Sequence, residues 1–278
     1  MRDFSKKKRI VIKVGSSSLI YKNTQALDLG RMDILVRCTC DIKNSGRDVA
    51  MVSSGAIVAG KKHLGLESAE TLCLKQACAS VGQGILMTTY QKLFSEYNNK
   101  TSQILLTKDI VLNETRMFDA KNTFNTLFEM GVIPVINEND TISTDEIRFG
   151  DNDTLSAVVA AISGADLLIM LSDIDGLFTA DPYVDENARL ITEVEEISDD
   201  IQDMARKSSS NVGTGGMQTK ITAAKIANDS GCDMVIANGN DFRNISRIMA
   251  GEEIGTLFKA HRVKDFNVRE FIINWNKR

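Results

Sequence analysis

The chain alternates short apolar runs with longer amphipathic stretches from end to end, and this alternation constrains its fold more than any other feature. Runs such as Arg9–Val14 and Leu167–Leu171 have the length and residue types of buried strands. Stretches such as Asp28–Asn44 place their apolar residues on one helical face. Strands that alternate with helices predict βαβ units, and therefore an α/β fold with a mainly parallel sheet covered on both faces.

The same periodicity assigns most of the remaining chain to strands and helices. We expect further strands at Asp48–Val52, Gln103–Leu106, Val132–Ile136 and Met234–Ala237, and helices from about Ala56 and at Gln76–Tyr97, Phe118–Met130, Asp153–Ser163, Met217–Asp229 and Asp241–Met249. Pro134 lacks a backbone donor, which favours a position near a sheet edge or a strand end.

Polar clusters follow several of these strands at the point where each strand ends. Right-handed crossovers place the carboxyl ends of parallel strands along one edge of the sheet, where open α/β sheets bind their ligands. Four clusters in register therefore predict a site at this edge: Gly15–Ser18, Ser53–Gly55, Asn137–Asp140 and Ser172–Asp173.

Two lysines are candidates to bind an anion at this edge. Lys13 lies near the end of the first strand, and Gly15 behind it lets backbone N–H groups approach a ligand. The surrounding residues match neither the P-loop nor the dinucleotide-binding motif. The second candidate is a glycine pair and the first turn of a helix, Thr214-Gly215-Gly216-Met217-Gln218-Thr219-Lys220. A solvated lysine and a glycine-rich hinge are the alternatives.

Acidic and amide residues gather in two loops, Asn137–Asp140 and Gly150–Asp153. They are good helix caps and turn formers, and Asp153 in particular could cap the helix that follows it. They could also bind a divalent cation, or bind an ammonium group and orient the lysines. Ser54 at a strand-to-helix junction suits a carboxylate ligand, or forms a simple turn. A serine hydrolase is excluded because Ser54 has no suitable histidine and no G-x-S-x-G context.

Composition narrows the class of protein. A net charge of −4 over 278 residues argues against a nucleic-acid partner, and no apolar run is long enough to span a membrane. Five cysteines without a secretion signal favour a reduced, cytoplasmic location. Cys38 and Cys40 lie two apart in a helical pattern, where side chains diverge, so no metal site is assigned.

An ordered set of motifs resembles the amino acid kinase family over roughly residues 9–258. The motifs are Val11-Ile-Lys-Val-Gly15, Val52-Ser-Ser-Gly-Ala56, Val135-Ile-Asn-Glu-Asn-Asp140, Gly150-Asp-Asn-Asp153, Leu171-Ser-Asp173 and Thr214–Lys220. The resemblance implies a three-layer αβα sandwich that transfers the γ-phosphoryl group of ATP to the γ-carboxylate of L-glutamate with Mg²⁺, which is the first step of proline biosynthesis. Members acting on aspartate, acetylglutamate or carbamate, and a non-catalytic metabolite-sensing module, are the alternatives.

Residue roles follow from the same resemblance. It implies that Lys13 and Lys220 bind the phosphates and stabilise the transferring group, and that Asp153 orients them. It implies that glutamate is bound by Ser54, Asp140 and Asn152, assisted by Asn137 and Asp151. Acidic residues here favour a substrate with a free ammonium group. The implied nucleotide contacts are Lys13, Gly15, Ser172, Asp173 and the segment Thr214–Lys220, with Ser172 where the family more often has threonine.

The resemblance also bears on organisation. We expect one kinase domain over residues 1–258, an apolar tail over 259–278 that packs on the domain or on a partner subunit, and no C-terminal PUA domain, which many bacterial members carry. Homo-oligomers, dimers or tetramers, and functional coupling to a glutamyl phosphate reductase are the expected partnerships.

Overall fold

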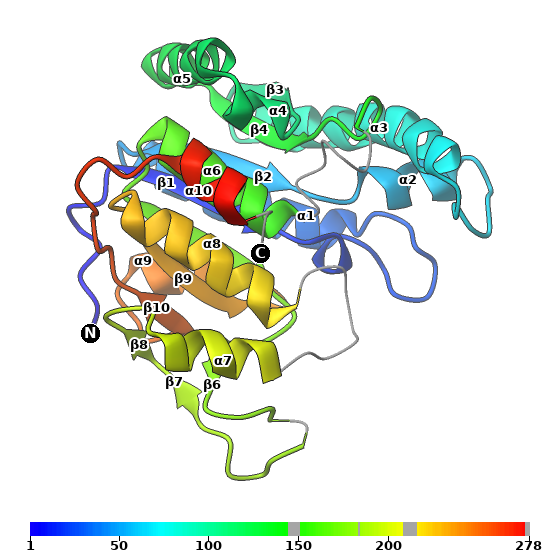
Figure 1. Cartoon of the computed structure of the whole chain (residues 1–278). Coiled ribbons are helices and arrows are strands. Elements are labelled where there is room, and N and C mark those ends of the chain that lie inside the picture. Colours follow the sequence, from blue (N-terminus) through cyan, green and yellow to red (C-terminus); the bar gives the residue numbers. More distant parts are fainter. Residues whose placement is uncertain (144–150, 183, 208–215, 276–278) are drawn as a thin grey trace.

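An eight-stranded sheet forms the centre of the computed structural model, which describes residues 1–143, 151–182, 184–207 and 216–275 (Figure 1). The strands run parallel from β3 to β9, and β10 is antiparallel to β9. In spatial order they are β3 (Thr101–Leu106), β4 (Ile133–Glu138), β2 (Asp48–Ser53), β1 (Arg9–Val14), β5 (Leu167–Ser172), β9 (Asp233–Asn238), β10 (Thr256–Phe258) and β8 (Glu193–Val194). The mainly parallel sheet predicted from the sequence is confirmed.

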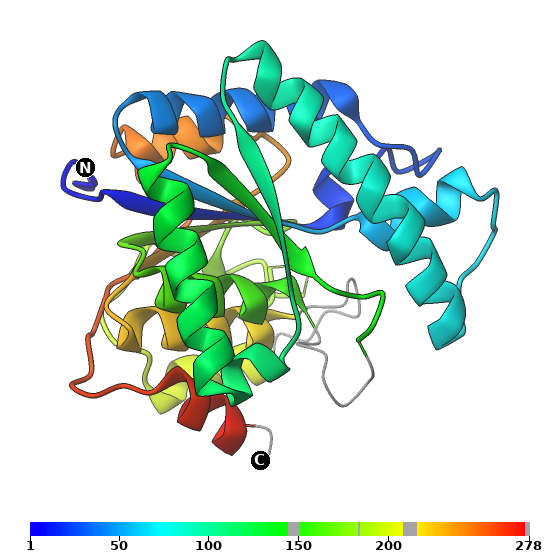
Figure 2. The ribbon, with the colours of Figure 1, turned by 90° about the horizontal axis from the view of Figure 1, so that it is seen from above.

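Helices cover both faces of this sheet (Figure 2). One face packs against α1 (Leu29–Asn44), α3 (Leu72–Glu96) and α9 (Asn244–Met249). The other packs against α5 (Glu114–Glu129), α6 (Asn152–Ser163), α8 (Met217–Asp229) and α10 (Val268–Trp275). The expected three-layer αβα sandwich is therefore confirmed. The alternating faces of the central strands explain it, because Val11 points into one layer and Ile10 and Ile12 point into the other.

Shorter elements complete the described residues. They are the 3₁₀ turn η1 (Ser16–Ser18), the helices α2 (Ala56–His63), α4 (Asp109–Leu112) and α7 (Asp199–Lys207), and a small antiparallel pair of β6 (Leu177–Phe178) and β7 (Leu190–Ile191). None of the described helices is both long and apolar enough to cross a membrane.

Pro134 is the second residue of β4, which is an interior strand. It is aligned with Ser102 of β3, whereas the pairing of β4 with β2 begins one residue later, at Val135. The missing donor therefore falls at a strand end, one of the two positions that the sequence favoured.

The residues after β10 turn back onto the domain. Ile272 of α10 is buried in the same core cluster as Phe124 of α5, and Phe271 packs against that cluster. The rings of Phe266 and Phe271 lie 5.8 Å apart between centroids. Burial of these apolar side chains holds α10 beside α4.

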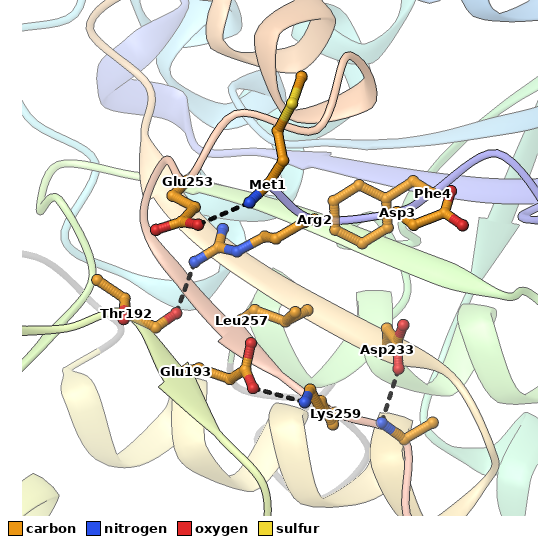
Figure 3. Close-up of a pocket in the computed structure, with 11 residues that line it drawn as sticks. Met1, Arg2, Asp3, Phe4, Thr192, Glu193, Asp233, Glu253, Leu257 and Lys259 are labelled. Atoms are coloured by element: carbon orange, nitrogen blue, oxygen red, sulfur yellow. Dashed lines mark hydrogen bonds and ion pairs between the residues drawn. The ribbon is translucent and has the colours of Figure 1, made fainter.

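The first residues of the chain are bound to the segments that precede β8 and β10 (Figure 3). Arg2 donates hydrogen bonds to the carbonyl oxygens of Thr192, Ile254 and Gly255, at 2.6, 2.6 and 2.9 Å. Its backbone N–H also donates to Gly251. One guanidinium group thereby links the residue before β8 to the two residues before β10.

Candidate active site

The carboxyl ends of four neighbouring strands, β4, β2, β1 and β5, converge on one polar region. This arrangement follows from the parallel register, in which Val14 pairs with Ser53 and Lys13 pairs with Met170. A cavity of about 280 Å³ opens here. Its walls are Lys13, Gly15, Ser16, Ser17, Ser18, Ser54, Asp151, Asn152, Asp153, Leu171, Ser172, Asp173 and Lys220. The strand-end clusters at Gly15, Ser54 and Ser172 thus meet in one place, as the sequence predicted.

Two buried lysines share one buried carboxylate in this cavity. The Nζ atom of Lys13 lies 2.5 Å from Oδ1 of Asp153, and the Nζ atom of Lys220 lies 3.0 Å from Oδ2. The three side chains are 10% exposed or less. Asp151 and Asp173 also line the cavity, so its suitability for an anionic ligand rests on the two adjacent ammonium groups rather than on its total charge.

Asp153 can reach both lysines because a different residue caps helix α6. The side chain of Asp151 accepts a hydrogen bond from the backbone N–H of Thr154 at 2.7 Å, which makes Asp151 the N-cap. Asp153 lies inside the first turn and points to the lysines instead. The interpretation of Asp153 as the N-cap is therefore wrong.

The two aspartates respond to burial in opposite ways. Burial disfavours the ionised form of Asp153, but the charges of Lys13 and Lys220 outweigh burial and hold the pKa of Asp153 below its usual value of 3.8. For Asp151, burial and the charge of Asp153 raise the pKa above the same value. Asp153 is therefore the firmly ionised partner of the lysines.

Lys220 is placed by the start of helix α8. Gly216 is the N-cap residue, and Lys220 lies in the first turn of the helix. The hydroxyl of Thr219 donates to Oδ2 of Asp153 at 3.1 Å, beside the Lys220 contact. The N-terminus of α8 and its lysine thus face the same cavity as β1, an arrangement that binds phosphates well.

A second polar cluster adjoins the lysines and holds Ser54. The amide nitrogen of Asn152 donates to Oγ of Ser54 at 2.7 Å, to the carbonyl of Ser53 at 3.2 Å and to Oδ1 of Asn137 at 3.0 Å. Ser54 precedes Gly55, whose φ of +105° is a left-handed conformation that glycine adopts without strain. The tight turn brings the Ser54 side chain to the cavity wall.

Not every residue predicted for the site lies on the cavity wall. Asn137 stands behind Asn152, and Asp140 lies in the turn after β4. Met217 is buried in the hydrophobic core, and Gln218 is half-buried in the first turn of α8. Thr214 and Gly215 lie outside the described residues. The roles assigned to these residues remain predictions.

Two positions that sequence reasoning missed lie against the site. Gly239 follows β9, its N–H donates to the carbonyl of Ser172 at 2.6 Å, and an added Cβ would lie 2.9 Å from Oγ of Ser18. The rule that flagged the other strand ends applies equally to Asn238-Gly239-Asn240 and could have found it. Gln83 on α3 contacts Asn137, and no pattern marks it.

A larger cavity, of about 670 Å³, lies at the opposite end of the sheet (Figure 3). Its charged side chains bind one another or the backbone. The N-terminal ammonium pairs with Glu253 at 2.9 Å, and Lys259 pairs with Glu193 at 2.5 Å. Asp233 accepts from the backbone of Ala260 at 2.7 Å. These charged groups hold neighbouring chain segments together. We therefore do not assign this cavity as the active site, although it is the larger of the two.

A parallel sheet with two buried lysines in a cavity at the carboxyl ends of its strands suits a protein that binds an anionic ligand. The family model for the amino acid kinase family matches residues 8–238, and the chain belongs to that family.

Two relatives are about half identical to this chain. A protein named glutamate 5-kinase from Carboxydothermus hydrogenoformans is 52% identical over 268 residues, which cover 96% of this chain and 72% of the relative. A protein of the same name from Clostridium perfringens is 48% identical and covers 92% of this chain and 96% of its own length.

Solved structures support the fold. Carbamate kinase from Giardia lamblia bound to AMP-PNP has a TM-score of 0.67 at 16% identity, covering 93% of this chain and 100% of its own. UMP kinase from Bacillus anthracis has a TM-score of 0.61 at 18% identity, with coverages of 91% and 96%. At such low identity the similarity concerns the fold alone.

Proposed function

We propose that this chain transfers the γ-phosphoryl group of ATP to the γ-carboxylate of L-glutamate and forms L-glutamyl 5-phosphate, the first step of proline biosynthesis. The observation that carries the proposal is the buried Lys13–Asp153–Lys220 trio beside the Ser54–Asn152 cluster. The relatives named glutamate 5-kinase, at about half identity over nearly the whole chain, favour glutamate as the acceptor.

Lys13 and Lys220 act on the transferring phosphoryl group in this proposal. Phosphoryl transfer requires alignment and charge neutralisation more than covalent help. Two ammonium groups fixed on opposite oxygens of Asp153 are already oriented before the substrate binds, so they stabilise developing charge at no further cost in reorganisation.

The nucleophile in this reaction needs no general base. A glutamate side chain has a pKa near 4.3 in water and is already ionised at neutral pH. The enzyme must therefore orient the carboxylate and screen it from the phosphates. The hydroxyl of Ser54, next to the lysines, is the group we assign to orienting the carboxylate, and Asn152 holds Ser54 in place by donating to its Oγ atom at 2.7 Å.

The phosphate groups of ATP match the backbone and lysine groups that line the cavity. Gly15 has no side chain between the backbone and Lys13, and its added Cβ would lie 3.7 Å from Nζ of Lys13. Phosphate oxygens can therefore approach the backbone and both lysines, with Ser172 and Asp173 on the neighbouring wall. Mg²⁺ is expected to take its oxygen ligands mainly from the phosphates and water, so we assign it no protein ligand.

Three further elements of the proposal concern context. We infer a cytoplasmic enzyme, and a homo-oligomer of two or four chains. We also infer functional coupling to a glutamyl phosphate reductase, because the acyl phosphate product hydrolyses readily. Its delivery to the next enzyme would limit that loss.

A coupled assay of ADP release tests the proposal directly. Purified protein with ATP and Mg²⁺ is offered glutamate, aspartate, acetylglutamate, carbamate and UMP in parallel, and the product is trapped with hydroxylamine. We expect release with glutamate and formation of its hydroxamate. Preference for another acceptor would replace glutamate in the proposal, and no turnover with any acceptor would favour a metabolite-sensing module.

A further inference from the structure

We propose that Gln83 of helix α3 is a positioning residue for the amino-acid acceptor, acting through Asn137 and Asn152. The inference deepens the proposed function and rests on it for the identity of the acceptor. Gln83 is 9% exposed and lies behind the residues that form the cavity wall.

The first link fixes the orientation of the Asn137 amide. Its Oδ1 atom accepts a hydrogen bond from the backbone N–H of Glu138 at 2.9 Å. A backbone N–H can only donate, so this contact assigns the oxygen of the amide without ambiguity. The amide nitrogen must then face the other way, where it donates to Oε1 of Gln83 at 2.9 Å. Gln83 supplies the acceptor that a buried donor requires.

The second link carries this orientation to Asn152. Oδ1 of Asn137, held by Glu138 and Gln83, accepts from Nδ2 of Asn152 at 3.0 Å. The same nitrogen donates to the carbonyl of Ser53 at 3.2 Å, and a carbonyl can only accept. The nitrogen of Asn152 is therefore the atom turned into the protein.

The third link sets what the cavity offers a ligand. With its nitrogen engaged, Asn152 has Oδ1 as its acceptor for a ligand donor. Oγ of Ser54 accepts from Asn152 at 2.7 Å, so the hydroxyl proton of Ser54 is directed elsewhere and can be donated to a ligand. One acceptor beside one donor matches a molecule that carries both an ammonium group and a carboxylate. Gln83 stabilises this polarity from behind the wall, because it accepts from the Asn137 amide in the orientation that the Glu138 N–H sets.

Helix α3, which carries Gln83, is held in place by close packing against α2. Gly82 and Gly60 allow α3 and α2 to cross so closely that an added Cβ at either glycine would overlap backbone atoms of the other helix. On the same side of α3, the hydroxyl of Tyr90 lies 2.8 Å from Oγ of Ser53. The helix therefore contacts both Asn137 and Ser53, the last residue of β2, which directly precedes Ser54.

Two matched substitutions test the role of Gln83. Gln83→Met keeps the length of the side chain and removes the acceptor, while Gln91→Met makes the same change at an exposed position of the same helix. We expect Gln83→Met to raise the KM for the amino acid about tenfold, because Asn137 loses its partner, with the KM for ATP unchanged. Gln91→Met should change neither KM. Equal changes in both KM values, or none, would overturn the inference.

A rescue variant and a spectroscopic readout separate positioning from packing. Gln83→Glu restores an acceptor for Asn137 and should recover most of the affinity for the amino acid. In nuclear magnetic resonance, the side-chain amide signals of Asn137 and Asn152 should shift in Gln83→Met and stay in place in Gln91→Met. An unmoved Asn152 signal would refute the relay whatever the enzyme phosphorylates. Conversely, a shifted signal in a protein that does not phosphorylate glutamate would reject only the proposed function.

Discussion

Asp153 shows how a single residue can organise the charges of a site. Its two oxygens bind different lysines, and neither oxygen is needed to cap the helix, because Asp151 does that. The sequence places two aspartates two residues apart before an apolar helix, and both qualify as caps by composition. The contacts decide between them, because Asp153 meets two lysines that come from distant parts of the chain.

Replacing Asp153 by asparagine should damage both stability and turnover. Lys13 and Lys220 would lose the buried carboxylate that they share, which costs on the order of 3–5 kcal/mol in unfolding free energy. We expect kcat to fall about 100-fold as the two ammonium groups lose their alignment. Chemical denaturation and steady-state kinetics measure the two effects. Asp119→Asn, at an exposed position of α5, is the control and should be silent.

The lowered pKa of Asp153 predicts how the stability of the chain changes as the pH falls. A carboxyl whose pKa is lower in the folded chain stabilises the fold at pH values above its unfolded pKa, here near 3.8, and loses that contribution as the pH falls through the folded value. The difference in unfolding free energy between the native chain and Asp153→Asn should thus be constant near neutrality and narrow below pH 3.8. Urea titrations across that range would show it. A gap that widens on acidification would contradict the assignment.

At the scale of elements, long buried strands and amphipathic helices could be predicted, and the shortest ones could not. β1 and α8 have the predicted bounds, because continuous β-branched runs and helical periodicity are strong signals. β7, β8 and β10 have two or three residues each, too few for any period to appear. β10 pairs with β9, β8 pairs with β10, and β7 pairs with β6, so each forms through a partner strand that its own sequence does not reveal.

The crossing of α2 and α3 should be intolerant of a single methyl group. Gly82→Ala would force the two helices apart, and we expect a loss of about 1–3 kcal/mol in stability with a higher KM for the amino acid. Gly84→Ala on the same helix meets no atom within 4 Å and should stabilise the chain by up to about 1 kcal/mol through helix propensity. Thermal unfolding of both variants makes the comparison. Equal behaviour of the two would show that the crossing is not tightly packed.

At the scale of the whole molecule, the site is assembled from segments far apart in the chain. Lys13 comes from β1 and Gly15 directly follows that strand, whereas Asp153 comes from α6 and Lys220 from α8. The rule that parallel strands end at one edge predicted that Gly15, Ser54 and Ser172 would meet, whereas the place of Asp153 between the two lysines was implied by the family resemblance. It could not predict Gln83, because a glutamine in the middle of a helix gives no sign of which neighbour it contacts.

A substitution at Arg2 should lower the stability of the chain without changing its activity. Arg2→Lys replaces a planar fork by a single ammonium group, which cannot reach Thr192, Ile254 and Gly255 together. We expect a loss of about 1–3 kcal/mol in stability. Activity of the folded protein should be unchanged, because Arg2 lies at the end of the sheet away from Lys13. Denaturation and kcat at low temperature test both statements, and a large fall in kcat would show that the two ends are coupled.

The central place of β1 in the sheet has a consequence for synthesis on the ribosome. β1 is the first strand to be made, yet one of its two neighbours, β5, is made only after all of α1 to α6 has been translated. Until then the apolar face of β1 has no complete cover, and a nascent chain that stalls before Leu167 exposes it. Truncated or stalled translation products of this protein are therefore expected to depend on chaperones, whereas the finished chain covers β1 between β2 and β5.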